Sequence, residues 1–296
     1  MTPHGTHPRT DRTAAIPASE PPDLADGIDT SIAHPARRYN YWLGGKDNFA
    51  ADRASGDAIA RKFPGIRKAA IENRKLMCRV VDWAARQGIT QFVDIGTGIP
   101  VSPNTHETAQ AIQPAARVVY VDNDPLVLAH ARALLTSTTQ RGRTEYMQAD
   151  LRDAQAILDH DAVRDTIDFT QPVAVLLFAV LHFLPDEAQV RHILHTLTAP
   201  LAADSILAAS HATYDFMPAP TRRQLETELA GEAGQHGTFQ PRTGEQFLDL
   251  FASNGLEPVE PGLVSAIRWH PQLQPHPGES VTDADASSYA YVGRRP

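Results

Sequence analysis

The chain has 296 residues, 42% of them hydrophobic, which is enough to bury the core of one large domain. A net charge of −8 excludes a broadly basic surface, so a nucleic-acid partner is not expected. The single cysteine, Cys78, excludes an intrachain disulfide and a cysteine-based zinc site. Apolar runs stay below about 18 residues, so we expect no membrane span and a cytoplasmic protein.

Two segments precede the main domain. Residues 1–27 are polar and proline-rich without hydrophobic periodicity, which predicts a disordered tail rather than a secretory signal. Residues 28–66 bring Tyr39, Tyr41 and Trp42 together just before a pair of glycines. This composition favours either a helical segment packed on the core or a lid over a ligand.

The main domain, residues 67–296, begins with helical spacing over 67–87, where Gly88 is placed to end the helix. Strands and helices then alternate regularly. The expected strands cover 91–95, 117–121, 144–148, 173–178 and 205–210, separated by helical patterns at about 104–113, 124–139, 151–161 and 185–200. Such alternation predicts an α/β fold with a doubly wound parallel sheet, in which ligands bind at the carboxyl ends of the strands.

The pattern changes after residue 210. Residues 214–252 favour a helical insertion, in which Thr243 and Gln246 match a capping box. Two further strands are expected near 264–269 and 289–292. The pattern therefore adds two strands after the doubly wound parallel part of the sheet.

The most informative motif is the turn after the first strand, where Asp94 is followed by Gly96 and Gly98. Glycine has no Cβ, so a ligand can approach the backbone closely. A pyrophosphate site would use backbone N–H groups at a helix N-terminus, where a carboxylate is unwelcome. A ligand with an amine and a sulfonium suits Asp94, so S-adenosylmethionine (SAM) is the expected ligand.

Three acids, Asp94, Asp122 and Asp150, follow one another at intervals of 28 residues. One interval suits one strand–helix unit, so all three are expected along one edge of the sheet. Asp94 would face the amino-acid end of SAM, Asp122 the ribose hydroxyls, and Asp150 the adenine amine, with the N–H of Leu151 nearby. Each acid alone also has a structural explanation, because aspartate is common after strands and at helix N-caps.

Four other residues are candidates for cofactor binding. Thr97 lies within the glycine turn, and Phe178 ends the fourth strand. Asn123 is expected to reach the adenine through its backbone. Arg74, in the helix before the first strand, is either a charge-assisted partner of the SAM carboxylate or a surface arginine.

These motifs resemble the class I SAM-dependent methyltransferases. More narrowly, the stretches Tyr39–Asp52, Asn73-Arg74 and Asp122–Arg132 are similar to the actinobacterial S-adenosyl methyltransferase family, long catalogued as a domain of unknown function. The resemblance covers residues 28–295 and implies a Rossmann-like class I methyltransferase fold, with a seven-stranded, mostly parallel sheet and helices on both faces. It also implies SAM as methyl donor and S-adenosylhomocysteine as product. It supplies no substrate, and by analogy with other enzymes of this fold it points to a homodimer.

Methyl transfer depends on positioning the acceptor, and a general base is needed only when the acceptor is a poor nucleophile. His182 and His211 follow the fourth and fifth strands and are candidates for that base, with Tyr39 as a third. Packing without chemistry is the alternative for each. The thirteen histidines form no H-x-x-x-H or H-E-x-x-H pattern, so we expect no metal site.

Four functions remain open. The first is methylation of a small molecule, such as an aromatic or indole-like secondary metabolite, because residues 178–186 lack the Asn-Pro-Pro-Tyr-like motif of amino methyltransferases. The second keeps SAM but acts on RNA or protein. The third is an NAD-dependent oxidoreductase, disfavoured by Val101 at the third glycine position and by Asp94. The fourth is a SAM-binding regulator without turnover.

Overall fold

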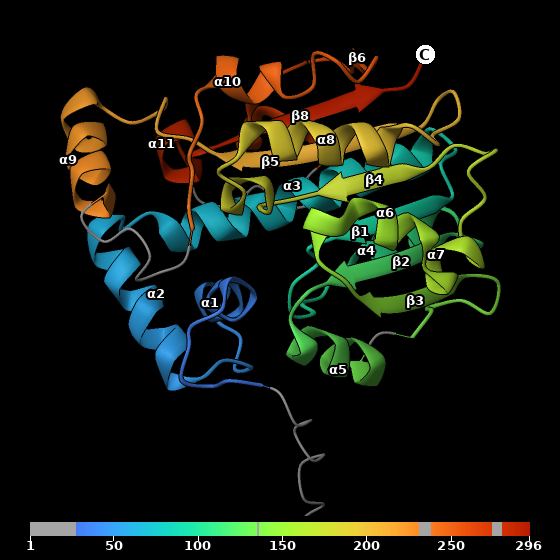
Figure 1. Cartoon of the computed structure of the whole chain (residues 1–296), viewed down its shortest axis with the longest axis horizontal. Helices are drawn as coiled ribbons and strands as arrows, with labels where there is room; N and C mark the ends of the chain where they lie inside the picture. Colours follow the sequence, from blue (N-terminus) through green and yellow to red (C-terminus); the bar gives the residue numbers. More distant parts are fainter. Residues whose placement is uncertain (1–27, 135, 231–237, 274–279) are drawn as a thin grey trace, which may run out of the picture.

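The computed structural model describes residues 28–134, 136–230, 238–273 and 280–296. Within them lies a mixed sheet of eight strands in the order β3-β2-β1-β4-β5-β8-β6, with β7 paired to β8. The strands are β1 Gln91–Ile95, β2 Arg117–Asp122, β3 Arg143–Gln148, β4 Ala174–Leu177, β5 Ile206–Ala212, β6 Glu257–Pro258, β7 Val264–Ser265 and β8 Ser288–Arg294. β1 to β5 are mutually parallel and β8 is antiparallel to β5. The carboxyl ends of the five parallel strands therefore share one edge (Figure 1).

Helices cover both faces of this sheet. They are α1 Pro35–Trp42, α2 Ala50–Lys62, α3 Ile66–Arg86, α4 Thr105–Ile112, α5 Pro125–Leu134, α6 Ala154–Asp159, α7 Asp161–Arg164, α8 Glu187–Thr198, α9 Ala219–Ala230, α10 Gly244–Asp249 and α11 Asp283–Ala286, with single-turn 3₁₀ helices η1 Leu151–Asp153, η2 Leu181–Phe183, η3 Ala266–Arg268 and η4 Pro271–Leu273. Phe92 packs in the core formed with α3 and α4, whereas Val93 packs in the core formed with α6, α7, α8 and α10. Successive strand residues point to opposite faces, so the apolar run of β1 serves both cores.

Helix α3 packs one apolar stripe, including Leu76, Val80 and Ala84, against the sheet. It ends where the sequence predicts, because Gly88 adopts a φ of +93° and the N–H of Ile89 returns to the carbonyl of Ala84 at 3.1 Å. Among the described residues, no helix is both long and apolar enough to cross a membrane.

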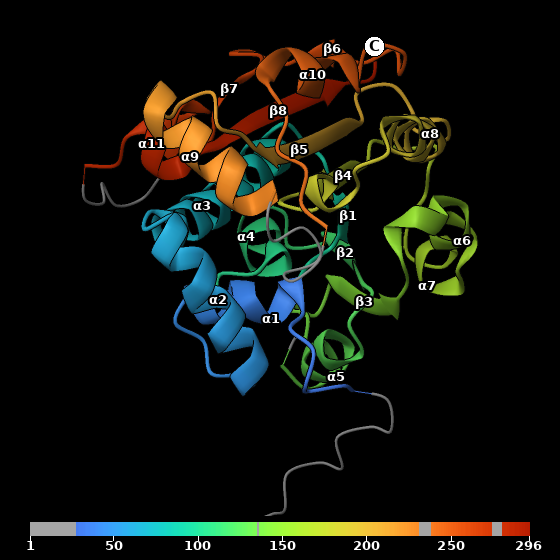
Figure 2. The same ribbon diagram turned by 60° about the vertical axis from the view of Figure 1, so that its left-hand side comes forward.

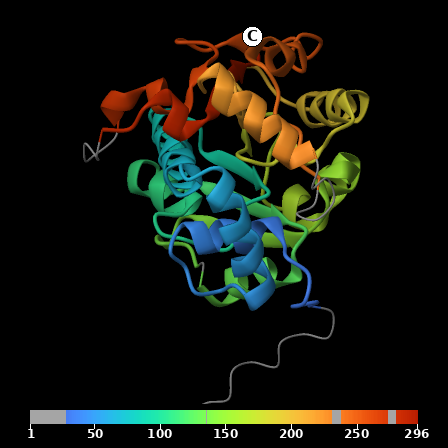
Figure 3. The same cartoon turned by 90° about the vertical axis from the view of Figure 1, so that its left-hand side faces the viewer.

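Three helices stand at the carboxyl edge of the sheet, where the expected site lies. They are α1 and α2 from the N-terminal segment and α9 from the insertion after β5 (Figure 1). Figures 2 and 3 bring this edge toward the viewer and show the same three helices in front of the strand ends. The N-terminal segment is therefore helical, and it lies beside the edge where ligands bind in such sheets.

The α/β class and the mostly parallel sheet are confirmed, with one strand more than expected, the two-residue β6. The strand expected over 264–269 is shorter: only β7 is extended, and the chain continues as η3. The guanidinium of Arg79 donates hydrogen bonds to the carbonyls of Ala266 and Trp269, so these groups are not available to pair with a strand. The helix expected over 124–139 is shorter, because α5 covers Pro125–Leu134 and residues 136–139 are not helical. Residues 1–27, expected as a tail, lie outside the described residues.

Candidate active site

The three acids of the expected site lie at the carboxyl ends of β1, β2 and β3. Asp94 is opposite Tyr120 in the pairing of β1 with β2, and Asp122 is opposite Gln148 in the pairing of β2 with β3. Asp150 follows just beyond the end of β3. Each acid thus lies two residues further along its strand than the one before. The three carboxylates therefore lie in a row at the carboxyl edge of the sheet.

The glycine turn after β1 is held against β2. The N–H groups of Gly96 and Thr97 both donate to the carbonyl of Val121, at 2.7 and 3.2 Å. Gly96 and Gly98 have φ values of +74° and +70°, which glycine adopts at little cost. A Cβ on Gly98 would meet no atom within 4 Å. Space therefore remains beside the turn for a ligand.

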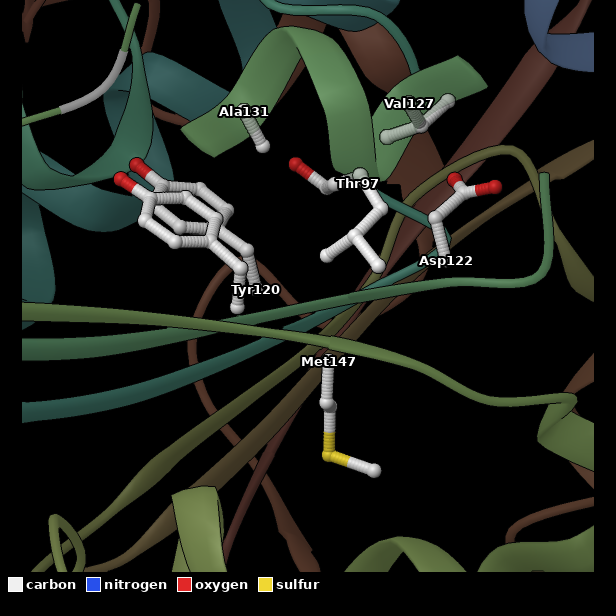
Figure 4. A pocket seen from close by; sticks show the side chains of 8 residues that line it. Thr97, Tyr120, Asp122, Val127, Ala131 and Met147 are labelled. Carbon is white, nitrogen blue, oxygen red and sulfur yellow. The ribbon is translucent and has the colours of Figure 1, made fainter. Parts of the chain in front are cut away.

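Asp122 is the carboxylate that ties this turn to β2. Its Oδ2 accepts the N–H of Gly98 at 2.8 Å, and its Oδ1 accepts that of Asp124 at 2.9 Å. Burial raises the pKa of Asp122, and these two N–H groups oppose the shift. Each oxygen has a second lone pair, so ribose hydroxyls could donate to Asp122 without breaking either bond. Figure 4 shows its side chain beside Thr97 and Val127.

Asp94 is buried between the turn and α4. Its Oδ2 accepts the hydroxyls of Thr105 and Thr97 at 2.6 and 3.4 Å, while no described residue donates a hydrogen bond to its Oδ1. Burial raises the pKa of Asp94, and the bond from Thr105 opposes the shift. A cationic amine at Oδ1 would favour the charged carboxylate. The free oxygen and the space beside Gly98 fit the amino-acid end of SAM.

Asp150 and Asn123, expected at the adenine, are more exposed. Asp150 caps η1 by accepting the N–H of Arg152 at 2.9 Å, and its second oxygen accepts from the guanidinium of Arg152 at 3.0 Å. Leu151 is the first residue of η1. The carbonyl of Asn123 accepts from the amide of Gln148 at 3.3 Å. Each oxygen of Asp150 keeps a second lone pair, so an adenine amine could donate to it beside Arg152.

Arg74 has a different partner from the one expected. Its Nη2 donates to the carbonyl of Val101, to that of Pro103 at 2.9 Å and to Oδ1 of Asn104 at 3.1 Å. These acceptors belong to the long loop that follows the glycine turn. Arg74 therefore fixes this loop through Nη2, and its pairing with the SAM carboxylate stays a prediction.

His211 is buried at the end of β5 with both ring nitrogens occupied. Its Nδ1 donates to the carbonyl of Ala212 at 2.8 Å, and its Nε2 accepts from Nη1 of Arg242 at 2.9 Å. Burial lowers the pKa of His211 to about 3, so the ring is neutral at pH 7. A ring without a free nitrogen cannot take a proton from an acceptor. The expectation of a base at His211 is corrected: this ring holds Arg242.

Arg242, which the sequence did not single out, joins three segments. Its guanidinium donates to the carbonyls of Leu181 and Leu184, at 3.3 and 2.8 Å, besides its bond to His211. Its Nε lies 3.7 Å from a carboxylate oxygen of Glu187. Arg242 thereby fastens the chain before α10 to the turn after β4. Most of its partners are backbone carbonyls, which leave no mark in the sequence.

His182 lies in η2, just after β4, among aromatic rings. Its ring centre is 4.4 Å from that of Phe183 and 5.2 Å from that of Phe239, a residue that is 42% exposed. The N–H of Ala212 donates to Nδ1 at 3.4 Å, so the neutral ring carries its proton on Nε2. Burial lowers the pKa of His182 well below its ordinary value. Only Nε2 remains for a ligand, as a donor.

Tyr39 is anchored to α3. Its hydroxyl donates to the carbonyl of Ala70 at 2.8 Å and accepts from Nδ2 of Asn73 at 3.0 Å. Burial raises the pKa of Tyr39, so the hydroxyl keeps its proton at neutral pH. The hydroxyl thus already donates one bond and accepts another within the fold, and a base at Tyr39 stays a prediction. Phe178, one residue past β4, is buried in the core on the α3 side of the sheet.

An ion pair that the sequence did not reveal docks α1 beside Asp122. Arg37 donates from Nε and Nη2 to the two oxygens of Asp124, at 2.8 and 3.1 Å, and Nδ1 of His34 lies 3.1 Å from the same carboxylate. Burial alone would raise the pKa of Asp124, but the bonds from His34 and Arg37 lower it. Because the N–H of Asp124 donates to Asp122, the N-terminal segment indirectly supports the expected ribose site.

Two hollows in the described part of the chain do not by themselves mark the cofactor site. A cavity of about 10 Å³ beside Asp122 has room for about one water and none for a nucleoside (Figure 4). A hollow of about 750 Å³ between α6, α7 and the end of α8 contains none of the expected site residues. Within the described ranges, no group of three or more His, Cys, Asp or Glu side chains could hold a metal ion.

The burial of His211 predicts a loss of stability in acid. In the unfolded chain His211 has the ordinary histidine pKa of about 6.5, so it binds a proton below that pH. In the folded protein it binds that proton only near pH 3, and acid therefore favours the unfolded state. Between pH 7 and pH 5, the wild type should lose about 2 kcal/mol more unfolding free energy than His211→Gln. Urea unfolding at both pH values measures this difference, with the exposed His192→Gln as control. Equal losses in wild type and His211→Gln would contradict the assignment.

Five parallel strands followed by an antiparallel strand, with acids at the ends of three neighbouring strands, are the arrangement of the Rossmann-like class I methyltransferase fold. The family model described as S-adenosyl methyltransferase matches residues 22–296. This chain belongs to that family.

Two solved structures are similar over nearly the whole chain. A DUF574 family protein from Streptomyces avermitilis is 42% identical, covers 90% of this chain and 99% of its own, and superposes with a TM-score of 0.81. A protein from Thermobifida fusca classed as a methyltransferase is 38% identical, with coverages of 93% and 98% and a TM-score of 0.78. No curated protein matches the sequence. The protein is a SAM-dependent methyltransferase by family and fold.

Proposed function

We propose that the methyl acceptor is a small aromatic or indole-like molecule, of the kind found among secondary metabolites, and that the enzyme works in the cytoplasm. The observation that carries this proposal is the aromatic surface around His182. Phe239 lies against the His182 ring while 42% of its own surface is exposed. An exposed aromatic ring beside a buried histidine is a suitable wall for a flat acceptor.

When bound, SAM supplies a methyl group on a sulfonium, and its transfer leaves S-adenosylhomocysteine. Asp94 would hold the amine through its free Oδ1, and Asp122 would accept the ribose hydroxyls. The glycine turn leaves space for the part of SAM that lies between its amine and its ribose. His182 would donate from Nε2 to the acceptor and so orient it. A donor suits an acceptor that is already a good nucleophile, for which no general base is needed.

Two features favour a small acceptor over RNA or protein. Helices α1, α2 and α9 stand over the carboxyl edge, so the edge is not an open platform (Figures 2 and 3). The net charge of −8 provides no general attraction for RNA phosphates. Methylation of RNA or protein is the runner-up, and a SAM-binding regulator would bind without transferring.

Labelled-methyl transfer tests the proposal. The enzyme is incubated with methyl-labelled SAM and a panel of phenols, indoles and aromatic acids, with total RNA and denatured protein as separate arms. We expect label in an aromatic acceptor, and Phe239→Ala should raise the KM for it about 2- to 13-fold with little change in SAM affinity. Leu248→Ala, at an exposed site on α10, is the matched control. Label in RNA or protein alone, or in no arm, would overturn the proposal.

A further inference from the structure

A residue other than glycine adopts a left-handed conformation at the end of β4. Ala179 has a φ of +55°. This region is unfavourable for a residue with a Cβ and persists only where the surroundings hold it. The next residue, Val180, packs so closely on the glycine turn that a Cβ on Gly96 would lie 2.1 Å from its Cγ1. Beyond it comes His182, so this turn joins the cofactor side of the site to the acceptor side.

A continuous series of hydrogen bonds holds this turn. The N–H of Ala179 donates to the hydroxyl of Ser210 on β5 at 2.9 Å, and that hydroxyl donates to Oδ1 of Asn73 on α3. Nδ2 of Asn73 donates to the hydroxyl of Tyr39 at 3.0 Å, and Tyr39 donates to the carbonyl of Ala70 at 2.8 Å. Each hydroxyl both accepts and donates. The series therefore runs in one direction from the β4 turn to α1.

The middle of the series is shielded from water. The side chains of Ser210 and Asn73 belong to residues that are 1% and 7% exposed. Water cannot readily replace a lost partner there, so breaking one bond leaves a buried polar group unsatisfied. Asn73 holds the central place, because its carbonyl oxygen serves the β4 turn and its amide nitrogen serves α1. Asn73 reaches the β4 turn through Ser210 and reaches α1 directly at Tyr39.

We infer that Asn73 is a positioning residue, which holds the turn over residues 178–182 in the shape that the site requires and makes that shape depend on docked α1. α1 then touches the site twice, through Arg37 on the cofactor side and through Tyr39 on this series. The inference rests on the proposed function, since it assumes that the turn borders bound SAM. An asparagine that served only the fold would lower stability and leave the affinity of the folded protein unchanged.

Calorimetric titration with S-adenosylhomocysteine separates these roles. It is measured at 15 °C on the full chain, for wild type, Asn73→Leu, and the milder Ser210→Ala and Tyr39→Phe. Thr198→Val is the matched control, because its buried hydroxyl bonds to the carbonyl of Leu194 in α8. We expect Asn73→Leu to weaken binding about 10-fold, a typical coupling between sites, and Thr198→Val to leave it unchanged.

Glycine at position 179 provides a rescue that a merely structural role would not give. Glycine adopts the left-handed conformation without help, so adding Ala179→Gly to Asn73→Leu should restore most of the lost affinity. Amide hydrogen exchange in α1 should be faster in Asn73→Leu than in wild type, because the bond from Asn73 to Tyr39 is lost. It should be equally fast in the double variant, in which that bond is also missing. Unchanged affinity in Asn73→Leu and Ser210→Ala, or absence of rescue by glycine, would overturn the inference. Failure of the wild type to bind would instead refute the proposed cofactor site.

Discussion

We expect Gly96→Ala to lower the free energy of unfolding by about 2 to 5 kcal/mol and to abolish measurable SAM binding. The added Cβ would lie 2.1 Å from Cγ1 of Val180, and the β-branched valine has little freedom to turn away. The φ of +74° adds backbone strain for any residue other than glycine. Denaturant unfolding and calorimetry with SAM measure the two effects.

Gly98→Ala separates the clash from the strain. Its φ of +70° is similar, but its Cβ would meet no protein atom within 4 Å. We expect it to lower stability only by the strain, about 1 to 2 kcal/mol, and to weaken SAM binding because its Cβ would enter the space that the ligand occupies. Val180→Ala added to Gly96→Ala should recover part of the stability. Equal losses for both glycine variants would argue against a clash with Val180.

We expect Arg37→Met to destabilise the fold by about 3 to 5 kcal/mol, because Asp124 would be left charged, buried and without its bidentate partner. SAM affinity should fall as well, since the N–H of Asp124 orients Asp122. Urea unfolding gives the stability, and calorimetry at a temperature where the variant is folded gives the affinity.

Two further variants check the cause. Arg37→Met combined with Asp124→Asn should be less destabilised than Arg37→Met alone, because the unpaired charge is gone. Arg86→Met breaks an exposed pair with Asp82 on α3 and should change stability little. If the double variant loses as much as the two single losses added together, the buried ion pair is not the source of the effect.

The sequence predicted the part of the site that repeats with the fold. Asp94, Asp122 and Asp150 each follow a strand, and one strand–helix unit separates neighbours, so a shared edge follows from the alternation alone. The glycine turn was visible for the same reason, since its residues are adjacent in the chain. The contacts of the turn with the carbonyl of Val121 and the side chain of Val180 could not be predicted, because the folded sheet brings these residues to the turn.

The parts that could not be predicted are polar contacts between distant segments. Asp124 meets Arg37 from 87 residues away, and Ser210 meets Asn73 from 137 residues away. Such pairs have no periodic signature, and Arg242 binds backbone carbonyls that every residue possesses. The same limitation explains His211, Tyr39 and Arg74, whose positions the sequence indicated but whose hydrogen-bond partners only the fold supplies.

The central claim is that SAM lies across the ends of β1, β2 and β3 with its ribose on Asp122. The most direct test is a crystal structure of the protein with S-adenosylhomocysteine. We predict ribose hydroxyl oxygens at about 2.5–3.0 Å from the Asp122 carboxylate and the amino group beside Oδ1 of Asp94. A ribose bound away from Asp122, for example in the hollow between α6 and α8, would contradict the account.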